Sequence, residues 1–229
     1  MIDNFDTIEK FLKFDTEYFY KFECLIRNTD GDNILYDKNI SNTRKNLLVK
    51  SWYVDTATYF WNAKNEMKTL CDITGGRLYI TLDRKSAKKL LSESSKEIIN
   101  ILENTALFGA ELPPARTLCK LFNSKSSMVE TSDKANKTIM FDIDKKDKKL
   151  LDLCVSFVEH NYQKPVVLET KKGWHVVCYK KFNTEKIMDN LCEWAKVYNC
   201  YLSTDTVREF VSCEPNKLGL VYLPDLKEG

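Results

Sequence analysis

The order of periodic segments in the C-terminal half is the feature that most constrains the fold of this chain. Segments with a two-residue apolar period, typical of strands, alternate there with segments whose apolar residues recur at helical spacing. The order is strand, helix, strand, strand, helix, strand, and the segments are 138–144, 145–161, 165–170, 174–179, 184–199 and 218–224. Only seven Gly and five Pro occur in 229 residues, so we expect mostly regular elements joined by short loops.

This order predicts the split βαβ arrangement of ferredoxin-like and RRM-like sheets. We therefore predict an α/β (α+β) fold whose C-terminal sheet lies within residues 135–225. Residues 1–76 are predicted to form an N-terminal α/β extension, and residues 77–229 the core that carries the sheet. The polar, aperiodic stretch 123–137 predicts a surface loop at a subdomain boundary.

Two helices are expected between the extension and the sheet. The first covers 86–105, and its apolar residues share one stripe. The stripe consists of Leu90, Leu91, Ile98, Ile99 and Leu102. The second, shorter helix covers 112–122 and has Pro114 near its first turn.

Composition restricts the class of protein. With 35 basic and 33 acidic residues the net charge is +2, so nucleic-acid binding would need a local basic surface. The eight Cys form no C-x-x-C pair, which predicts no structural zinc and buried, reduced thiols. The N-terminus is charged throughout, and no apolar run approaches the ~18 residues of a membrane span. We expect a cytoplasmic protein with no membrane partner.

The segment TIMFDID places two carboxylates on one face of a strand. By alternation Ile139, Phe141 and Ile143 point to one side, and Asp142 and Asp144 to the other. Like charges at that spacing repel unless a cation lies between them, and hard oxygen ligands suit Mg²⁺ or Mn²⁺. The alternative is a strand end whose Asp side chains face water.

The segment VVLETKKGWHVVCYK predicts a hairpin with a basic turn. Lys171 and Lys172 supply charge, Gly173 allows close approach of the backbone, and His175 stands just inside the second strand. Such a turn is a candidate phosphate site. The alternative is an exposed hairpin with a half-buried histidine.

Together, Asp142-Ile143-Asp144 and the later Gly173-Trp-His175 resemble the first two motifs of archaeo-eukaryotic primases and primase-polymerases. The resemblance covers about residues 135–225, and the absence of a P-loop or zinc module would suit a small viral or phage member. The family's third motif is a further Asp on a later strand, for which Asp205 is the candidate.

The resemblance implies template-directed nucleotidyl transfer with two Mg²⁺ or Mn²⁺ ions. Asp142, Asp144 and Asp205 would hold the metal. His175, with Lys171 or Lys172 and Gly173, would bind the nucleotide's triphosphate, and Arg208 is a further candidate contact. Implied partners are a single-stranded template, NTP or dNTP, and a helicase or other replication subunit in trans. A viral protein would act in the host cytoplasm.

Two other interpretations stay open. Glu169-Thr-Lys171 is an E-x-K at a strand end, which resembles the PD-(D/E)xK metal-dependent nucleases. A primase-like fold that only binds nucleic acid or a protein partner is the non-enzymatic alternative, with Trp174 and Tyr179 available to stack bases. The nuclease interpretation gives His175 and Asp144 no role, and a binding module should not need Mg²⁺.

Overall fold

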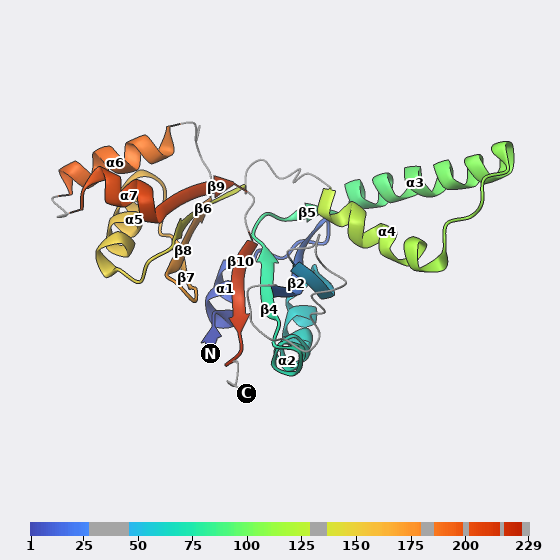
Figure 1. Cartoon of the computed structure of the whole chain (residues 1–229), viewed down its shortest axis with the longest axis horizontal. Helices are drawn as coiled ribbons and strands as arrows, with labels where there is room; N and C mark the ends of the chain where they lie inside the picture. Colours follow the sequence, from blue (N-terminus) through green and yellow to red (C-terminus); the bar gives the residue numbers. More distant parts are fainter. Residues whose placement is uncertain (28–45, 129–136, 180–185, 199–201, 216–217, 226–229) are drawn as a thin grey trace.

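The computed structural model describes residues 1–27, 46–128, 137–179, 186–198, 202–215 and 218–225, and shows two antiparallel sheets (Figure 1). In the first sheet the described strands run in the order β1-β10-β4-β2-β3, and β5 pairs with β2. These strands are β1 (Ile2–Asp3), β2 (Tyr18–Arg27), β3 (Asn46–Val54), β4 (Arg77–Thr81), β5 (Lys85–Ser86) and β10 (Leu218–Leu223). The predicted mixed α/β class is confirmed.

The second sheet has the described strand order β7-β8-β6-β9, and every neighbouring pair is antiparallel. The strands are β6 (Thr138–Ile143), β7 (Val166–Glu169), β8 (Trp174–Tyr179) and β9 (Val211–Pro215). The prediction that 218–224 completes this sheet is wrong, because β9 takes that place and β10 joins the first sheet. Close packing explains the position of β10: a Cβ on Gly219 would lie 3.0 Å from side-chain atoms of both Leu168 and Leu82.

Helices cover both sheets (Figure 1). The described helices are α1 (Phe5–Phe11), α2 (Ala57–Thr74), α3 (Ala87–Phe108), α4 (Ala115–Met128), α5 (Lys148–Asn161), α6 (Ile187–Val197) and α7 (Thr204–Phe210). The helices α5, α6 and α7 lie on one face of the second sheet, whereas α1 contacts β7 and β10 where the two sheets meet. Helix α4 extends to Met128, so the first part of the loop predicted at 123–137 is helical; residues 129–136 lie outside the described part.

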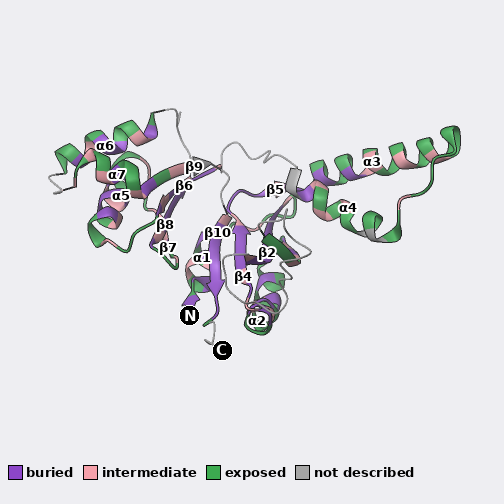
Figure 2. Ribbon diagram, viewed as in Figure 1, coloured by how far each residue is buried: buried purple, intermediate pink, exposed green. Residues whose placement is uncertain are grey.

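One hydrophobic core is continuous between the two sheets. Met140, Leu168 and Val177 of the second sheet pack in the same cluster as residues of α1, α2 and the first sheet. The other face of β6, with Ile139 and Phe141, packs in a second cluster under α5, α6 and α7. The strands β6 and β8 are accordingly buried on both faces (Figure 2). This confirms the predicted alternation along 138–143.

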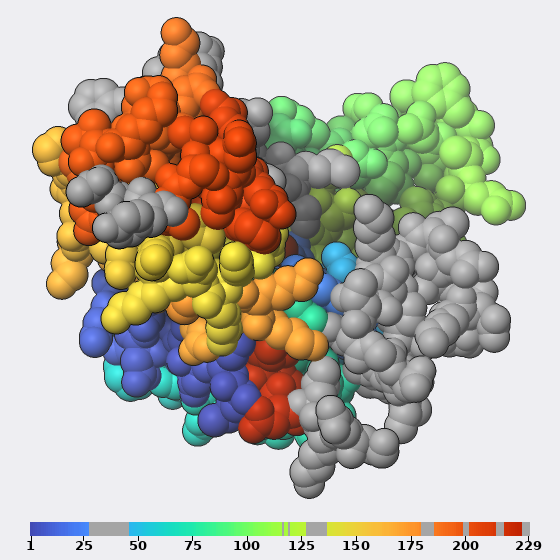
Figure 3. Space-filling view, turned by 60° about the vertical axis from the view of Figure 1, so that its left-hand side comes forward, coloured from blue at the N-terminus to red at the C-terminus, as the bar shows by residue number. Residues whose placement is uncertain are grey.

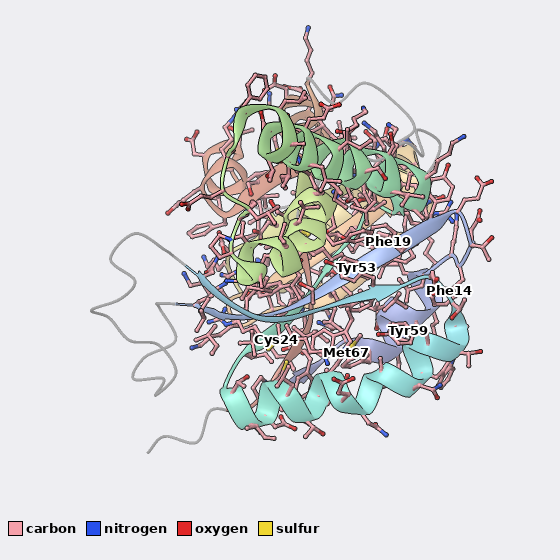
Figure 4. The ribbon with its side chains drawn as sticks, turned by 90° about the vertical axis from the view of Figure 1, so that its right-hand side faces the viewer. Phe14, Phe19, Cys24, Tyr53, Tyr59 and Met67 are labelled. Atoms are coloured by element: carbon pink, nitrogen blue, oxygen red, sulfur yellow. The ribbon has the colours of Figure 1, made fainter. Side chains whose placement is uncertain are left out.

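The first sheet also uses both of its faces. Cys24 of β2 and Met67 of α2 belong to the shared core, between the sheet and that helix (Figure 4). Phe19 and Tyr53 lie on the opposite face, with ring centroids 5.6 Å apart, and pack with Leu90 of α3. The expected helix at 86–105 is present as α3, and only Leu90 of the five stripe residues is buried.

The cysteines that the structure describes agree with buried, free thiols. Five of the six are buried and Cys213 is partly exposed; the side chains of the remaining two lie outside the described part. Burial raises the pKa of the Cys178 thiol to about 12, so this thiol stays protonated and unreactive at neutral pH.

None of the described helices combines the length and the apolar character that crossing a membrane requires.

The side chain of Asn4 connects the two sheets. Its Nδ2 donates to the Glu169 carbonyl of β7 at 2.9 Å and to the Leu220 carbonyl of β10 at 3.0 Å. Its Oδ1 accepts a hydrogen bond from the Glu169 N–H at 3.1 Å. Asn4 is itself buried, so these bonds satisfy backbone groups that water does not readily reach.

We predict that Asn4→Ala lowers the free energy of unfolding by about 2 kcal/mol, because it leaves buried backbone groups without their partner. Urea unfolding followed by circular dichroism measures this. Asn104→Ala is the matched control: Asn104 is exposed on α3, and its loss should change stability by less than about 0.5 kcal/mol. Equal effects of the two substitutions would contradict the role of Asn4.

Candidate functional site

Asp142 stands near the end of the central strand of the second sheet. Its strand, β6, is hydrogen-bonded to β8 on one side and to β9 on the other. Its neighbour Ile143 is fully buried in the helix-covered core, so alternation turns Asp142 to the opposite face. The Asp142 side chain is 20% exposed, which leaves its carboxylate accessible on a rigid strand.

His175 lies directly opposite Asp142 on β8. Its Nε2 is 3.4 Å from Asp142 Oδ1, close enough for a hydrogen bond or, with a protonated imidazole, an ion pair. His175 shares its strand face with Val177, which packs in the core between the sheets. The structure therefore brings together two residues that are 33 positions apart in the sequence.

The turn between β7 and β8 is closed by two hydrogen bonds. The Thr170 N–H donates to the Gly173 carbonyl, and the Gly173 N–H donates to Thr170 Oγ1, both at 3.0 Å. A Cβ on Gly173 would lie only 1.8 Å from the Ile143 carbonyl oxygen and 3.0 Å from the Lys145 nitrogen. The missing side chain thus lets the basic turn lie against the backbone that follows Asp142. From the sequence, Gly173 was expected to let the backbone approach a phosphate, and its contact with the Ile143 carbonyl was not predicted.

Asp144 follows β6 in the loop that leads to α5. Its side chain is exposed, and its N–H donates to the Phe210 carbonyl at the end of α7 at 2.9 Å. Lys145 Nζ lies 4.6 Å from the centre of the Phe210 ring, and Lys146 Nζ pairs with Glu169 Oε1 at 2.6 Å. Two lysines thus follow Asp144 directly in this loop, and their contacts are with Phe210 and Glu169.

Lys171 and Lys172 add to this basic surface from the turn on the other side. Both side chains are exposed. Because Gly173 seats the turn against the Ile143–Lys145 backbone, both lysines belong to the same end of the sheet as Asp142. The combination of accessible carboxylates and nearby ammonium groups suits a ligand that brings phosphates and a divalent cation together.

Asp205 and Arg208 lie on α7 and not on a strand. The expectation that Asp205 occupies a later strand is wrong, because Ser203 caps a short helix in which Asp205 is in the first turn. Arg208 Nη2 pairs with Asp189 Oδ1 of α6 at 2.5 Å, and this hydrogen bond raises the pKa of Arg208. On β9 the residue opposite Asp142 is Ser212, which sequence reasoning did not single out.

Within the described part of the chain, no three His, Cys, Asp or Glu side chains are grouped as ligands for one ion. Asp205 lies in the first turn of α7, and Phe210 is the last residue of that helix. The α-helix between these two residues spans about 7 Å along its axis. The fit to Mg²⁺ therefore rests on Asp142 and Asp144. Two protein carboxylates are sufficient for a Mg²⁺ site when substrate phosphates and water supply the other ligands of the octahedral coordination sphere, which is a common arrangement in proteins.

No family model matches this chain, and neither a curated protein nor a solved structure matches it.

We predict that Gly173→Ala lowers the free energy of unfolding by about 1–3 kcal/mol, because the added methyl group overlaps the Ile143 carbonyl. Urea unfolding measures the loss. The neighbouring Lys172→Ala removes an exposed side chain and should change stability by less than about 0.5 kcal/mol. Unchanged stability and unchanged imidazole resonances of His175 in Gly173→Ala would refute the close contact.

Proposed function

We propose that the protein is a template-directed nucleotidyltransferase, a primase or primase-polymerase. The observation that carries the proposal is the contact between Asp142 and His175 on neighbouring antiparallel strands, 3.4 Å apart. The first motif supplies the carboxylate and the second supplies the histidine. The Gly173 turn lies against the backbone that connects Asp142 to Asp144, which adds a second contact between the two motifs.

The proposed roles follow from the chemistry of each group. Asp142 and Asp144 hold divalent metal, with Asp205 as the candidate third carboxylate. When bound, the metal activates the 3′-hydroxyl and neutralises phosphate charge during in-line transfer. His175 donates a hydrogen bond to a phosphate oxygen, and Lys171 and Lys172 attract the triphosphate.

The strand order supports the proposal at the level of the fold. Numbered along the chain from β6, the described strands β9, β6, β8 and β7 stand in the order 4-1-3-2, with α5, α6 and α7 on one face. This order agrees with the split βαβ sheet expected from the resemblance. The candidate residues Asp142 and His175 lie on the face without these helices; that face packs in the core shared with the first sheet, and the Asp142 side chain is 20% exposed at its end.

The nuclease interpretation receives less support. Strand β7 ends at Glu169, so Lys171 of the E-x-K lies in the turn and not on the strand. The Glu169 carboxylate is paired with Lys146 at 2.6 Å, on an exposed surface. The contact between Asp142 and His175 would have no function in such a nuclease.

Base stacking by a non-catalytic module also receives less support. Trp174 packs against the cluster under the helices. The ring of Tyr179 stacks on Phe11 at a centroid distance of 5.3 Å, and its hydroxyl donates to the Phe11 carbonyl at 3.3 Å. The two aromatic residues named for base stacking are therefore engaged within the protein.

We predict that the wild-type chain extends a primer on single-stranded template with labelled NTP or dNTP when Mg²⁺ or Mn²⁺ is present. Asp142→Asn should abolish this activity, because it removes a charged metal ligand at nearly constant volume. The control is Asp152→Asn on the exposed surface of α5, which should extend primers like the wild type.

Each other outcome has a defined meaning. Degradation of the template, lost in Glu169→Gln, would replace the proposal by the nuclease interpretation. Template binding without any product, unchanged in Asp142→Asn, would leave a binding module. Full activity of Asp142→Asn would reject the proposed site.

We further predict that His175→Ala raises the KM for the nucleotide by at least tenfold, which is roughly the loss of one charge-assisted hydrogen bond. Steady-state extension at varied nucleotide concentration measures it. His160→Ala is the matched control, since His160 stacks on Trp194 at the end of α5. A fall in kcat at constant KM would instead assign His175 to the chemical step.

A further inference from the structure

The helices α3 and α4 form a hairpin that projects from the body of the protein (Figure 1). Only its base is attached: Leu90 packs on Phe19, and Tyr53 OH donates to Asn123 Oδ1 at 2.9 Å and lies 3.3 Å from Ser126 Oγ. In the space-filling view the hairpin is a lobe that stands apart from the elements of the second sheet (Figure 3). The rest of the hairpin has no packing partner among the described residues.

The projecting part of the hairpin carries apolar side chains. Nine large apolar residues between Leu91 and Phe122 are exposed, by 41% at Leu118 to 77% at Phe108. A groove of about 330 Å³ runs between the helices and is lined by apolar residues, among them Ile98 and Leu102 of α3 and Phe122 of α4. Monomeric soluble proteins seldom expose so much apolar surface in one patch.

The size of this surface matches that of a protein interface. At roughly 60–100 Å² of apolar area for each large side chain, nine of them present several hundred square ångströms. A standard interface buries about 800 Å² on each partner, including the polar rim. Helix α3, with 22 residues, is about 33 Å long, enough to pair along its length with another helix.

The two helices differ in charge. Helix α4 contains three basic residues and no acidic residue, whereas α3 contains three lysines and three glutamates and carries no net charge. Within the chain Lys125 Nζ pairs with Glu97 Oε2 of α3 at 2.9 Å. In a two-fold arrangement that places α4 of each copy beside α3 of the other, the two basic α4 helices are kept apart.

We propose that the hairpins of two copies pack together as a four-helix bundle and make the protein a homodimer. Each copy closes the apolar groove of the other, as antiparallel bundles bury their apolar faces. The attachment at Leu90 and Tyr53 leaves the body of each copy outside the bundle, so dimerisation does not require any change at Asp142 or His175. The proposal is independent of the proposed function.

Sedimentation velocity at micromolar concentration of the full chain tests this. The wild type should sediment as a dimer. Leu102→Glu should raise the dimer Kd by at least about tenfold, because it places a carboxylate in the apolar groove.

The matched control is Ile73→Glu, which changes an exposed isoleucine on α2, outside the hairpin. It should leave the dimer intact, and circular dichroism should show that all variants are folded. A monomeric wild type would overturn the proposal and point to a different protein as the partner of the hairpin. A dimer that Leu102→Glu and Ile73→Glu affect equally would also overturn it.

Discussion

The register between β6 and β8 is the constraint on which the candidate site depends. Phe141 pairs with Val176, and both are buried under the helices of the second sheet. Asp142 and His175 are then necessarily opposite each other on the other face. A slip of one residue would turn Asp142 toward α5 and bury an unpaired carboxylate there, at a cost of several kcal/mol. The apolar core therefore sets the register, and the register places Asp142 opposite His175.

This part of the site could be predicted from the sequence because its signals are local. The two-residue apolar period over 138–144 and over 174–179 indicates which side chains face a hydrophobic core. The Lys-Lys-Gly turn predicts that the two strands that it connects pair with each other. The contact of Asp142 with His175 combines those two signals. The environment of Asp205 gave no such signal. A seven-residue helix followed by the five-residue β9 contains too few periods for either element to be recognised.

The sequence also did not predict which of the two sheets the last strand joins. The segment LGLVYL has a strand pattern that suits either sheet equally well. Its place in the first sheet depends on Gly219, which fits against Leu168 and Leu82, and on the hydrogen bond from Asn4 to the Leu220 carbonyl. Likewise the apolar stripe of α3 correctly predicted a helix. It did not predict which surface packs on the apolar face of that helix, because periodicity identifies the face and not its packing partner.

In the proposed function, the charges around Asp142 would allow a nearly neutral chain to bind a strongly anionic substrate. Asp142 and Asp144 would attract a divalent cation, whereas the lysines of the adjacent loop and turn would repel a cation without bound phosphate. Those same lysines attract phosphates, which supply the remaining oxygen ligands that Mg²⁺ needs. In the proposed function, cation and triphosphate therefore each raise the affinity for the other, as linkage requires. In that proposal the nucleotide's phosphates would complete the ligands of a cation that Asp142 and Asp144 hold.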